Sequence, residues 1–207
     1  PVLRSARHQG QRIVCLSNLK QLTLAWLAYA DEHDSKIVIG SAFHITREHR
    51  GGIKVQEGWV GTAFLFPESR SAVIEDPNKG ALWPWIRDID VYRCPRGWPG
   101  HALTYSTLIS ANGHGAEGTI LTGSKAGGVQ KLGKRVGSTV LKLTSLTDII
   151  SPGAGQRAVF IDMGMIPLSS HFYVEYLYPK WTWFNPPPKH HRNGMTLSMA
   201  DGHVEYW

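Results

Sequence analysis

Residues 2 to 33 constrain the fold more than any other part of the chain. They contain no proline and a single glycine, and they are rich in Arg, Gln, Leu and Ala, which are good helix formers. This composition predicts one long helix. Apolar side chains recur at helical spacing only in its second half. We therefore expect the second half to dock and the first half to project into solvent; the packing residues are Leu16, Leu19, Trp26 and Leu27.

From Lys36 onward, short apolar runs alternate with glycine and proline, which is typical of strands separated by turns. A short helix is expected over Lys79–Asp88. One long helix followed by strands predicts an α+β fold rather than alternating α/β. The expected division is a helical spine, 1–33, and a β-rich globular domain, 34–207. The expected strands are Lys36–Ile39, Trp59–Phe66, Leu103–Ile109, Arg157–Asp162 and Phe172–Leu177, followed by a terminal hairpin.

The last residues carry the hairpin signal. Asp201-Gly202 lies between two runs of alternating polarity, which is the strongest short-range signal for a two-residue type I′ turn. Closing the ladder at Ala200 and His203 pairs Thr196 with Trp207. One side of the hairpin is then apolar, and we expect that side to lie on the core.

Composition bounds the class of protein. At 207 residues, with 42% apolar and 18% charged residues, the chain is long enough for one well-buried soluble domain. Its formal net charge of +6 could attract nucleic acid, an anionic membrane surface or an acidic polymer. The sequence has no recognition-helix motif and no aromatic-plus-basic sheet motif, so we expect no nucleic-acid partner.

Motifs for catalysis are missing from the sequence. There is no GxSxG elbow, neither cysteine has the local signature of a reactive thiol, and no phosphate-binding glycine loop occurs. We therefore expect a non-enzymatic protein with no catalytic residue and no cofactor.

A group of histidines and carboxylates could in principle ligate a metal: His190, His191, His203, Asp162 and Asp201. In a regular strand from His191 to Ala200, however, His191 lies on the face opposite Ala200 and its partner His203. A bulge near Asn193-Gly194 would undo that parity. We expect no metal here, and we expect His191 to anchor the start of the strand by hydrogen bonding.

Aromatic residues gather before the hairpin and form a possible ligand shelf made of Trp181, Trp183 and Phe184. Such a set could bind sugar or peptide, or it could form a core with a subunit contact. The two cysteines, Cys15 and Cys94, lie outside any CxxC pair, which disfavours zinc. They would be buried apolar residues in a reducing compartment and one disulfide in an oxidising compartment. The sequence alone leaves both states open.

Three separated blocks carry recognisable patterns. The first is Cys15-Leu16-Ser17-Asn18-Leu19-Lys20-Gln21-Leu22, with Tyr29-Ala30-Asp31 after it. The second is Gly80–Ile86 with Val91-Tyr92-Arg93-Cys94-Pro95. The third is an H-x9-DG pattern that consists of His191, Gly194, Asp201, Gly202 and His203. Together, in this order, the blocks resemble the prepilin-type pseudopilin family. Thr196 and Met199 stand where that family usually has Asn and Phe.

The resemblance implies a type IV pilin-like fold, in which a long N-terminal helix packs on an antiparallel sheet. It implies a subunit of a type II secretion or type IV pilus-like filament, with other pilin-like subunits and secretion-system proteins as partners. The expected location is the bacterial cell envelope, with an inner-membrane anchor and the globular domain in the periplasm or outside. In this family a leader and a hydrophobic helix half would precede Pro1.

The resemblance also implies a disulfide between Cys15 and Cys94, because the exterior of the cell envelope is oxidising. Some secretion pseudopilins bind Ca²⁺ in a C-terminal loop, and the nearest acidic candidates are Asp162 and Asp201. The sequence has no dense run of oxygen ligands. The alternative is a secreted carbohydrate- or polymer-binding domain on a pilin-like anchor, which the aromatic shelf and the positive charge favour.

Overall fold

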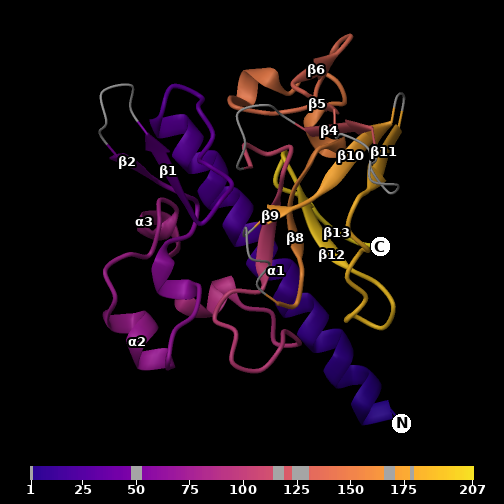
Figure 1. Cartoon of the computed structure of the whole chain (residues 1–207). Helices are drawn as coiled ribbons and strands as arrows, with labels where there is room; N and C mark the ends of the chain where they lie inside the picture. The colour runs from indigo at the N-terminus through magenta and orange to yellow at the C-terminus, as the bar shows by residue number, and fades with distance from the viewer. Residues whose placement is uncertain (1, 48–52, 114–118, 123–130, 166–170, 178–179) are drawn as a thin grey trace.

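A long N-terminal helix crosses the whole molecule. The computed structural model describes residues 2–47, 53–113, 119–122, 131–165, 171–177 and 180–207. Helix α1 spans Val2–Glu32, which confirms the predicted helix, and its first turns extend beyond the rest of the domain (Figure 1). It ends where Asp34 and Ser35 adopt φ values of 52° and 63° and the Ser35 N–H bonds back to Ala30 O.

Helix α1 docks as expected, through its second half. From Cys15 onward its buried side chains include Leu19, Leu22 and Trp26, which are fully buried. Of the other two predicted packing residues, Leu27 packs half-buried against the core and Leu16 is half-buried. No described residue before Cys15 is buried.

The main sheet has five strands in the order β13-β12-β8-β3-β9. All its pairings are antiparallel except β3 with β9. Helix α1 covers one face, where Thr23 Oγ1 lies 2.6 Å from Ser198 Oγ on β12. The structure is therefore α+β with a mostly antiparallel sheet. The strands are β3 Tyr105–Leu108, β8 Ala158–Asp162, β9 His171–Phe172, β12 Thr196–Met199 and β13 Val204–Tyr206.

Smaller elements surround this sheet. A four-stranded sheet has the order β11-β10-β4-β5, and two further pairs are β1–β2 and β6–β7. The remaining strands are β1 Phe43–Arg47, β2 Ile53–Glu57, β4 Thr119–Thr122, β5 Lys131–Gly133, β6 Arg135–Val136, β7 Thr139–Val140, β10 Val174–Leu177 and β11 Lys180–Trp183. The short helices are α2 Arg70–Glu75, α3 Trp83–Ile86, η1 Thr62–Phe64, η2 Ile89–Tyr92, η3 Leu146–Asp148 and η4 Ala154–Gln156.

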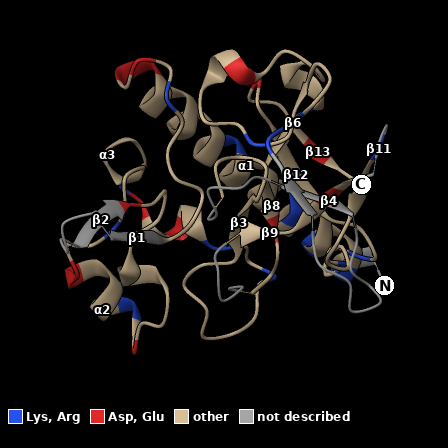
Figure 2. Ribbon diagram, turned by 45° about the horizontal axis from the view of Figure 1, so that its top comes forward, with Lys and Arg blue, Asp and Glu red and all other residues tan. Residues whose placement is uncertain are grey.

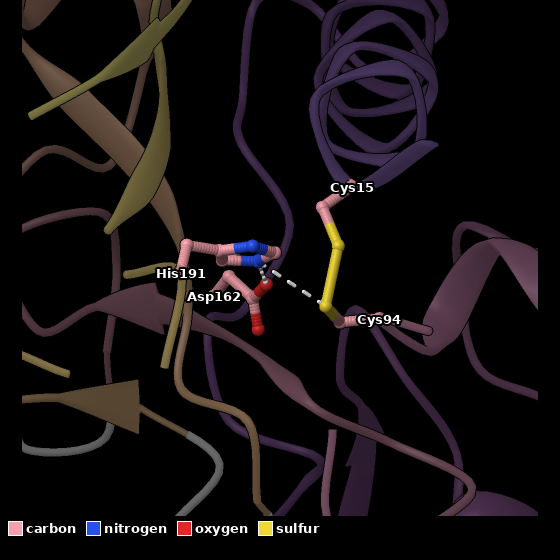
Figure 3. Close-up of side chains that lie close together, drawn as sticks. All are labelled: Cys15, Cys94, Asp162 and His191. Atoms are coloured by element: carbon pink, nitrogen blue, oxygen red, sulfur yellow. Dashed lines mark hydrogen bonds and ion pairs between the residues drawn. A yellow bond between two sulfur atoms is a disulfide. The ribbon is translucent and has the colours of Figure 1, made fainter. Parts of the chain in front are cut away.

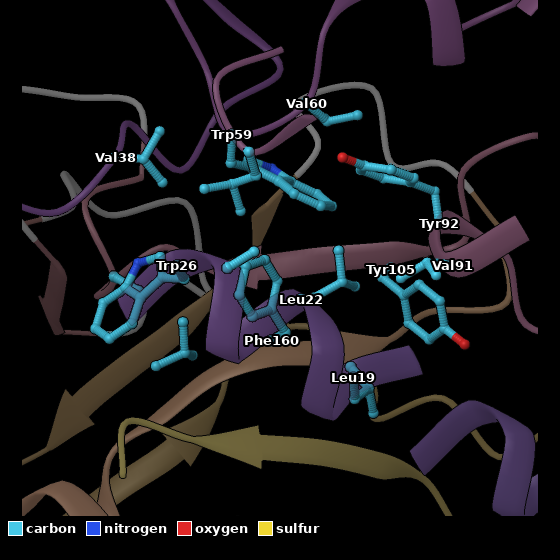
Figure 4. Close-up of a cluster of buried hydrophobic side chains, with 14 of the residues drawn as sticks. Leu19, Leu22, Trp26, Val38, Trp59, Val60, Val91, Tyr92, Tyr105 and Phe160 are labelled. Atoms are coloured by element: carbon cyan, nitrogen blue, oxygen red, sulfur yellow. The ribbon is translucent and has the colours of Figure 1, made fainter. Parts of the chain in front are cut away.

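The core has two parts, one on each face of the main sheet. The larger part joins α1, β8 and the loops through Leu22, Trp26, Trp59, Tyr92 and Phe160 (Figure 4). The smaller part lies on the other face and includes Leu108, Ile161, Phe172, Leu197 and Met199. Because apolar side chains pack on both faces, β8 is a nearly continuous apolar strand.

Two of the expected strands are wrong, and a third, Phe172–Leu177, is divided between β9 in the main sheet and β10 in the four-stranded sheet. Lys36–Ile39 makes only isolated bridges, at Lys36 and Ile39. Trp59–Phe66 is a loop that contains the 3₁₀ helix η1, because its N–H groups bond to other loops: Gly61 N donates to Lys79 O and Ala63 N to Asn78 O. Most of its apolar side chains are buried by these loops, whereas Phe66 is 75% exposed, so the run shows no strand alternation.

The terminal hairpin is confirmed, but its predicted turn is wrong. Ser198 pairs with Val204 and Thr196 with Tyr206, one residue away from the expected register. Gly202 N donates to Met199 O, and among the turn residues Gly202 alone has positive φ, at 89°. This three-residue turn spares Asp201 the left-handed conformation that a type I′ turn would require. Leu197 and Met199 face the smaller core, whereas Val204 lies on the α1 side with Ser198.

Candidate functional site

One residue from each of the three sequence blocks, namely Cys15, Cys94 and His191, lies where α1 leaves the domain. Cys15 and Cys94 form a disulfide, with their Cα atoms 5.2 Å apart (Figure 3). Both cysteines are fully buried. The bridge links the first buried residue of α1 to the segment after η2, so it confirms the pairing that the family resemblance implied.

Asn18, one turn along α1, strengthens the same junction. Its Nδ2 donates to the backbone oxygens of Arg93, at 3.1 Å, and Asp90, at 3.3 Å. The same Nδ2 lies 3.3 Å from the Tyr105 hydroxyl. These bonds tie α1 to the C-terminal end of η2.

A buried histidine–carboxylate group lies beside the disulfide. His191 Nε2 is 2.9 Å from Asp162 Oδ2 and 3.3 Å from Cys94 Sγ (Figure 3). His190 Nε2 lies 3.0 Å from the other carboxylate oxygen, Oδ1, which also accepts the Gly164 N–H at 3.0 Å. Asp162 is fully buried, and both of its oxygens are partnered.

The surroundings of Asp162 keep it ionised. Burial alone would raise the pKa of this carboxyl, but hydrogen bonds and charge from His190 and His191 outweigh that effect and lower the pKa below its ordinary value. A paired, hydrogen-bonded buried charge is costly to break, so the group fixes the end of β8 to the segment before β12.

A tight turn brings His191 to this position. Arg192 and Asn193 have φ values of 56° and 69°, and His191 and Gly194 exchange backbone hydrogen bonds of 3.2 Å. Positive φ at both central residues is the type I′ pattern, which the sequence predicts at Asp201-Gly202 instead. The chain from His191 to Ala200 is therefore not one regular strand, so strand alternation does not determine on which face His191 lies.

Gly194 and Tyr206 lock that turn. The Tyr206 hydroxyl donates to His191 O at 2.7 Å. A Cβ on Gly194 would lie 2.4 Å from the Tyr206 ring, so only glycine fits beneath the ring. His191 thus anchors the start of the strand by hydrogen bonding, as its sequence position suggested.

The other half of the H-x9-DG pattern lies at the far end of β12. Asp201 Oδ1 accepts the His203 N–H and lies 2.6 Å from Nδ1, while His203 Nε2 is 2.9 Å from Glu205 Oε1. The hydrogen bond to Glu205 raises the pKa of His203, and this effect outweighs a smaller opposing effect of burial. The hydrogen bond to Asp201 raises the pKa of His203 further. Gly202 faces Leu24 and Leu27 of α1.

Metal ligation has one geometric candidate among the residues that the structure describes. Donor atoms of Cys15, Cys94, Asp162 and His191 all lie within 4.8 Å of one another. The two sulfurs are joined, so they offer no thiolate in this state. The candidate group contains neither His203 nor Asp201. For Ca²⁺ the two acidic candidates stand apart, each paired with histidine.

The proposed aromatic shelf is divided. Trp181 and Trp183 alternate with Thr182 on β11 and line one cavity together with Trp207. Phe184 follows the strand and packs against Tyr173, with ring centroids 6.2 Å apart. Arg157 and Trp207 also line this cavity, and no short-range pattern in the sequence marks either residue as part of a site.

Comparison with family models, with curated proteins and with solved structures gave no match for this chain. Across the described part of the chain, no helix combines the length and the apolar character needed to span a membrane.

Proposed function

We propose that this chain is a non-enzymatic, pseudopilin-like subunit of a type II secretion or type IV pilus-like filament in the bacterial cell envelope. One observation carries the proposal: the half of α1 before Cys15 has no buried residue among those described, and it leaves Leu3 88% and Ile13 64% exposed. Its contacts with the domain are polar or cation–π and involve Ser5, His8 and Arg12. Helices of this length are marginal in water without tertiary contacts. An exposed half-helix of this kind is suited to packing against neighbouring copies.

The disulfide supports the same role. It joins Cys15, the first buried residue of α1, to Cys94 at the place where the helix leaves the domain. Force along a filament spine would pass from the helix into the domain through this covalent link. His191 and Asn18 brace it on either side.

The charges on α1 point to the kind of contact. Its first turn has no acidic residue and its last turn has no basic residue. Arg4 and Arg7 lie near the start, whereas Asp31 and Glu32 lie at the end (Figure 2 colours these charges). This arrangement opposes the helix dipole, so it does not serve the isolated helix. In staggered copies, the basic start of one helix would lie beside the acidic end of another.

Charge reversal in the complete gene product, expressed in its host, tests the proposal. We expect Arg4→Glu with Arg7→Glu to abolish assemblies that sediment from sheared cells and appear as filaments by electron microscopy. Adding Asp31→Lys and Glu32→Lys should restore them. Lys20→Glu, on an exposed part of the docked half, is the matched control. Absence of sedimenting assemblies in the wild type, or full assembly of the double variant, would refute the proposal.

A second candidate function is polymer binding on the same scaffold. The observation that favours it is the cavity shared by Trp181, Trp183 and Trp207. It is independent of the surface of α1, so either function can fail without the other.

A further inference from the structure

A buried arginine with two guanidinium nitrogens that find no hydrogen-bond partner among the described residues points to an unassigned binding site. Arg157 lies between η4 and β8, and its backbone oxygen accepts the Ala200 N–H at 2.8 Å. The residue is 3% exposed. Among the described residues, its Nε and Nη2 atoms have no hydrogen-bond partner. The guanidinium carbon lies 4.7 Å from the centre of the Trp181 ring.

Leaving a cation in this state is unfavourable. A charge removed from water needs a partner, and several kcal/mol are typically at stake for a buried ion. Burial lowers the pKa of Arg157 to about 10, which reflects that cost. The stacking on Trp181 compensates in part, by roughly 2 kcal/mol where the pair is desolvated.

Among the described residues, no carboxylate forms a hydrogen bond with the Nε or Nη2 atom of Arg157, although the charge of Asp148 offsets part of the effect of burial on the Arg157 pKa. Glu175 is buried on β10, but it pairs across the ladder with Thr182, whereas Tyr176 pairs with Trp181. Neighbouring residues of a strand point to opposite faces, so Glu175 lies on the face away from Trp181. Asp148 accepts the backbone N–H groups of Thr144 and Ser145 through Oδ2.

Arg157 lines a cavity of about 190 Å³. The indoles of Trp181, Trp183 and Trp207 form apolar walls, and Ser110 and Gln156 add neutral polar groups. Trp183 and Trp207 meet edge to face, with ring centroids 6.3 Å apart. The cavity is smaller than the roughly 300–1,000 Å³ of sites for drug-sized ligands, so it suits a single ring or side chain.

We propose that this cavity binds one uronate residue of an acidic polysaccharide, with the sugar carboxylate on the Arg157 guanidinium and the ring among the three indoles. The guanidinium fork matches a carboxylate in geometry and charge. Indole faces pack on the C–H faces of a sugar, and Ser110 and Gln156 suit its hydroxyl groups. The net charge of +6 would draw a polyanion toward the domain. The inference does not depend on the filament proposal.

Calorimetric titration of the protein with trigalacturonate tests this site. We expect saturable binding, and we expect the fully methyl-esterified trimer, which has the same ring but no charge, to bind at least tenfold more weakly. Arg157→Gln should weaken binding of the acid by roughly 30-fold or more, because the carboxylate loses a buried charged partner. Arg70→Gln is the matched control, since Arg70 is exposed and pairs with Asp90 elsewhere; its affinity should equal that of the wild type.

The outcomes are decisive in both directions. Preference for the acid over its ester, lost in Arg157→Gln and kept in Arg70→Gln, supports the site. No binding at millimolar concentration, equal binding of acid and ester, or preference for benzoate or an acidic peptide over the uronate overturns it. Thermal melting shows whether Arg157→Gln folds. If it does not, the acid–ester comparison on the wild type decides the question.

Discussion

The two ends of β8 bury opposite charges and treat them differently. Asp162, at the last position, has His190, His191 and the Gly164 N–H around its carboxylate. Arg157, just before the first position, has one aromatic ring and no hydrogen-bond partner for Nε or Nη2 within the described ranges. A buried charge whose hydrogen-bond partners come from the protein itself, such as Asp162, stabilises the fold. A buried charge with donor atoms that lack such partners among the described residues, such as Arg157, is available to bind a ligand.

The largest expected change in stability follows substitution of Asp162, the buried charge that has hydrogen-bond partners. Asp162→Ala should lower the free energy of unfolding by about 3–5 kcal/mol, because it removes the shared acceptor of two histidines in a buried site. Urea denaturation followed by circular dichroism measures the change. Asp90→Ala, which breaks only an exposed pair with Arg70, should cost about 1 kcal/mol or less. Equal losses in the two variants would contradict a structural role for Asp162.

The same carboxylate should shape stability in acid. Its pKa is lowered in the folded protein, so its contribution is present above the unfolded value of about 4. The contribution is lost as pH falls through the lower folded value. The wild type should therefore lose its advantage over Asp162→Asn on acidification, and a difference that does not change with pH would count against this account.

The disulfide should be next in size. Replacing Cys15 and Cys94 by serine should cost about 2–4 kcal/mol, because the bridge closes a long loop in the unfolded chain. Since His191 lies 3.3 Å from Cys94, its substitution should not be additive with loss of the bridge. Arg157→Met has no contact with the bridge, so its effect should add. A double-mutant cycle measures both terms, and additivity at His191 would argue that the histidine and the bridge act separately.

A smaller effect is expected from the His203 network. The pKa of His203 is raised, first by Glu205 and then by Asp201, so its stabilisation is present below the unfolded value of about 6.5. It is lost as pH rises through the folded pKa. Because the side chains are 35–42% exposed, we expect well under 1 kcal/mol, seen as a flatter pH profile in His203→Gln. Titration of the His203 ring by NMR at or below its ordinary pKa would contradict the network.

The sequence predicted what short-range patterns encode. Helix α1 and its docked half followed from spacing, and β8, β12 and β13 followed from alternation and apolar runs. The pairing of Cys15 with Cys94 came from resemblance rather than from spacing. The sequence indicated Asp162 only as a candidate metal ligand, although Asp162 directly follows the apolar run Ala158–Ile161.

The misses have physical causes. The Trp59–Phe66 run packs against other loops through most of its apolar side chains, and a loop packed in this way leaves no periodic signal. The type I′ turn occurs at Arg192-Asn193, where Tyr206 fixes it from a distant part of the sequence. Arg157 reads as an ordinary charged residue at the start of a strand. Only the fold shows that its guanidinium is buried beside Trp181, in a cavity that Trp207 also lines.

The unfolding free energy of Arg157→Met, measured beside that of Asp162→Ala, tests the central contrast most directly. We expect no loss, or a gain, because methionine fills the space and removes an unpaired buried charge. A loss of about 3 kcal/mol or more, similar to that of Asp162→Ala, would contradict the account, because it would show that both buried charges stabilise the fold.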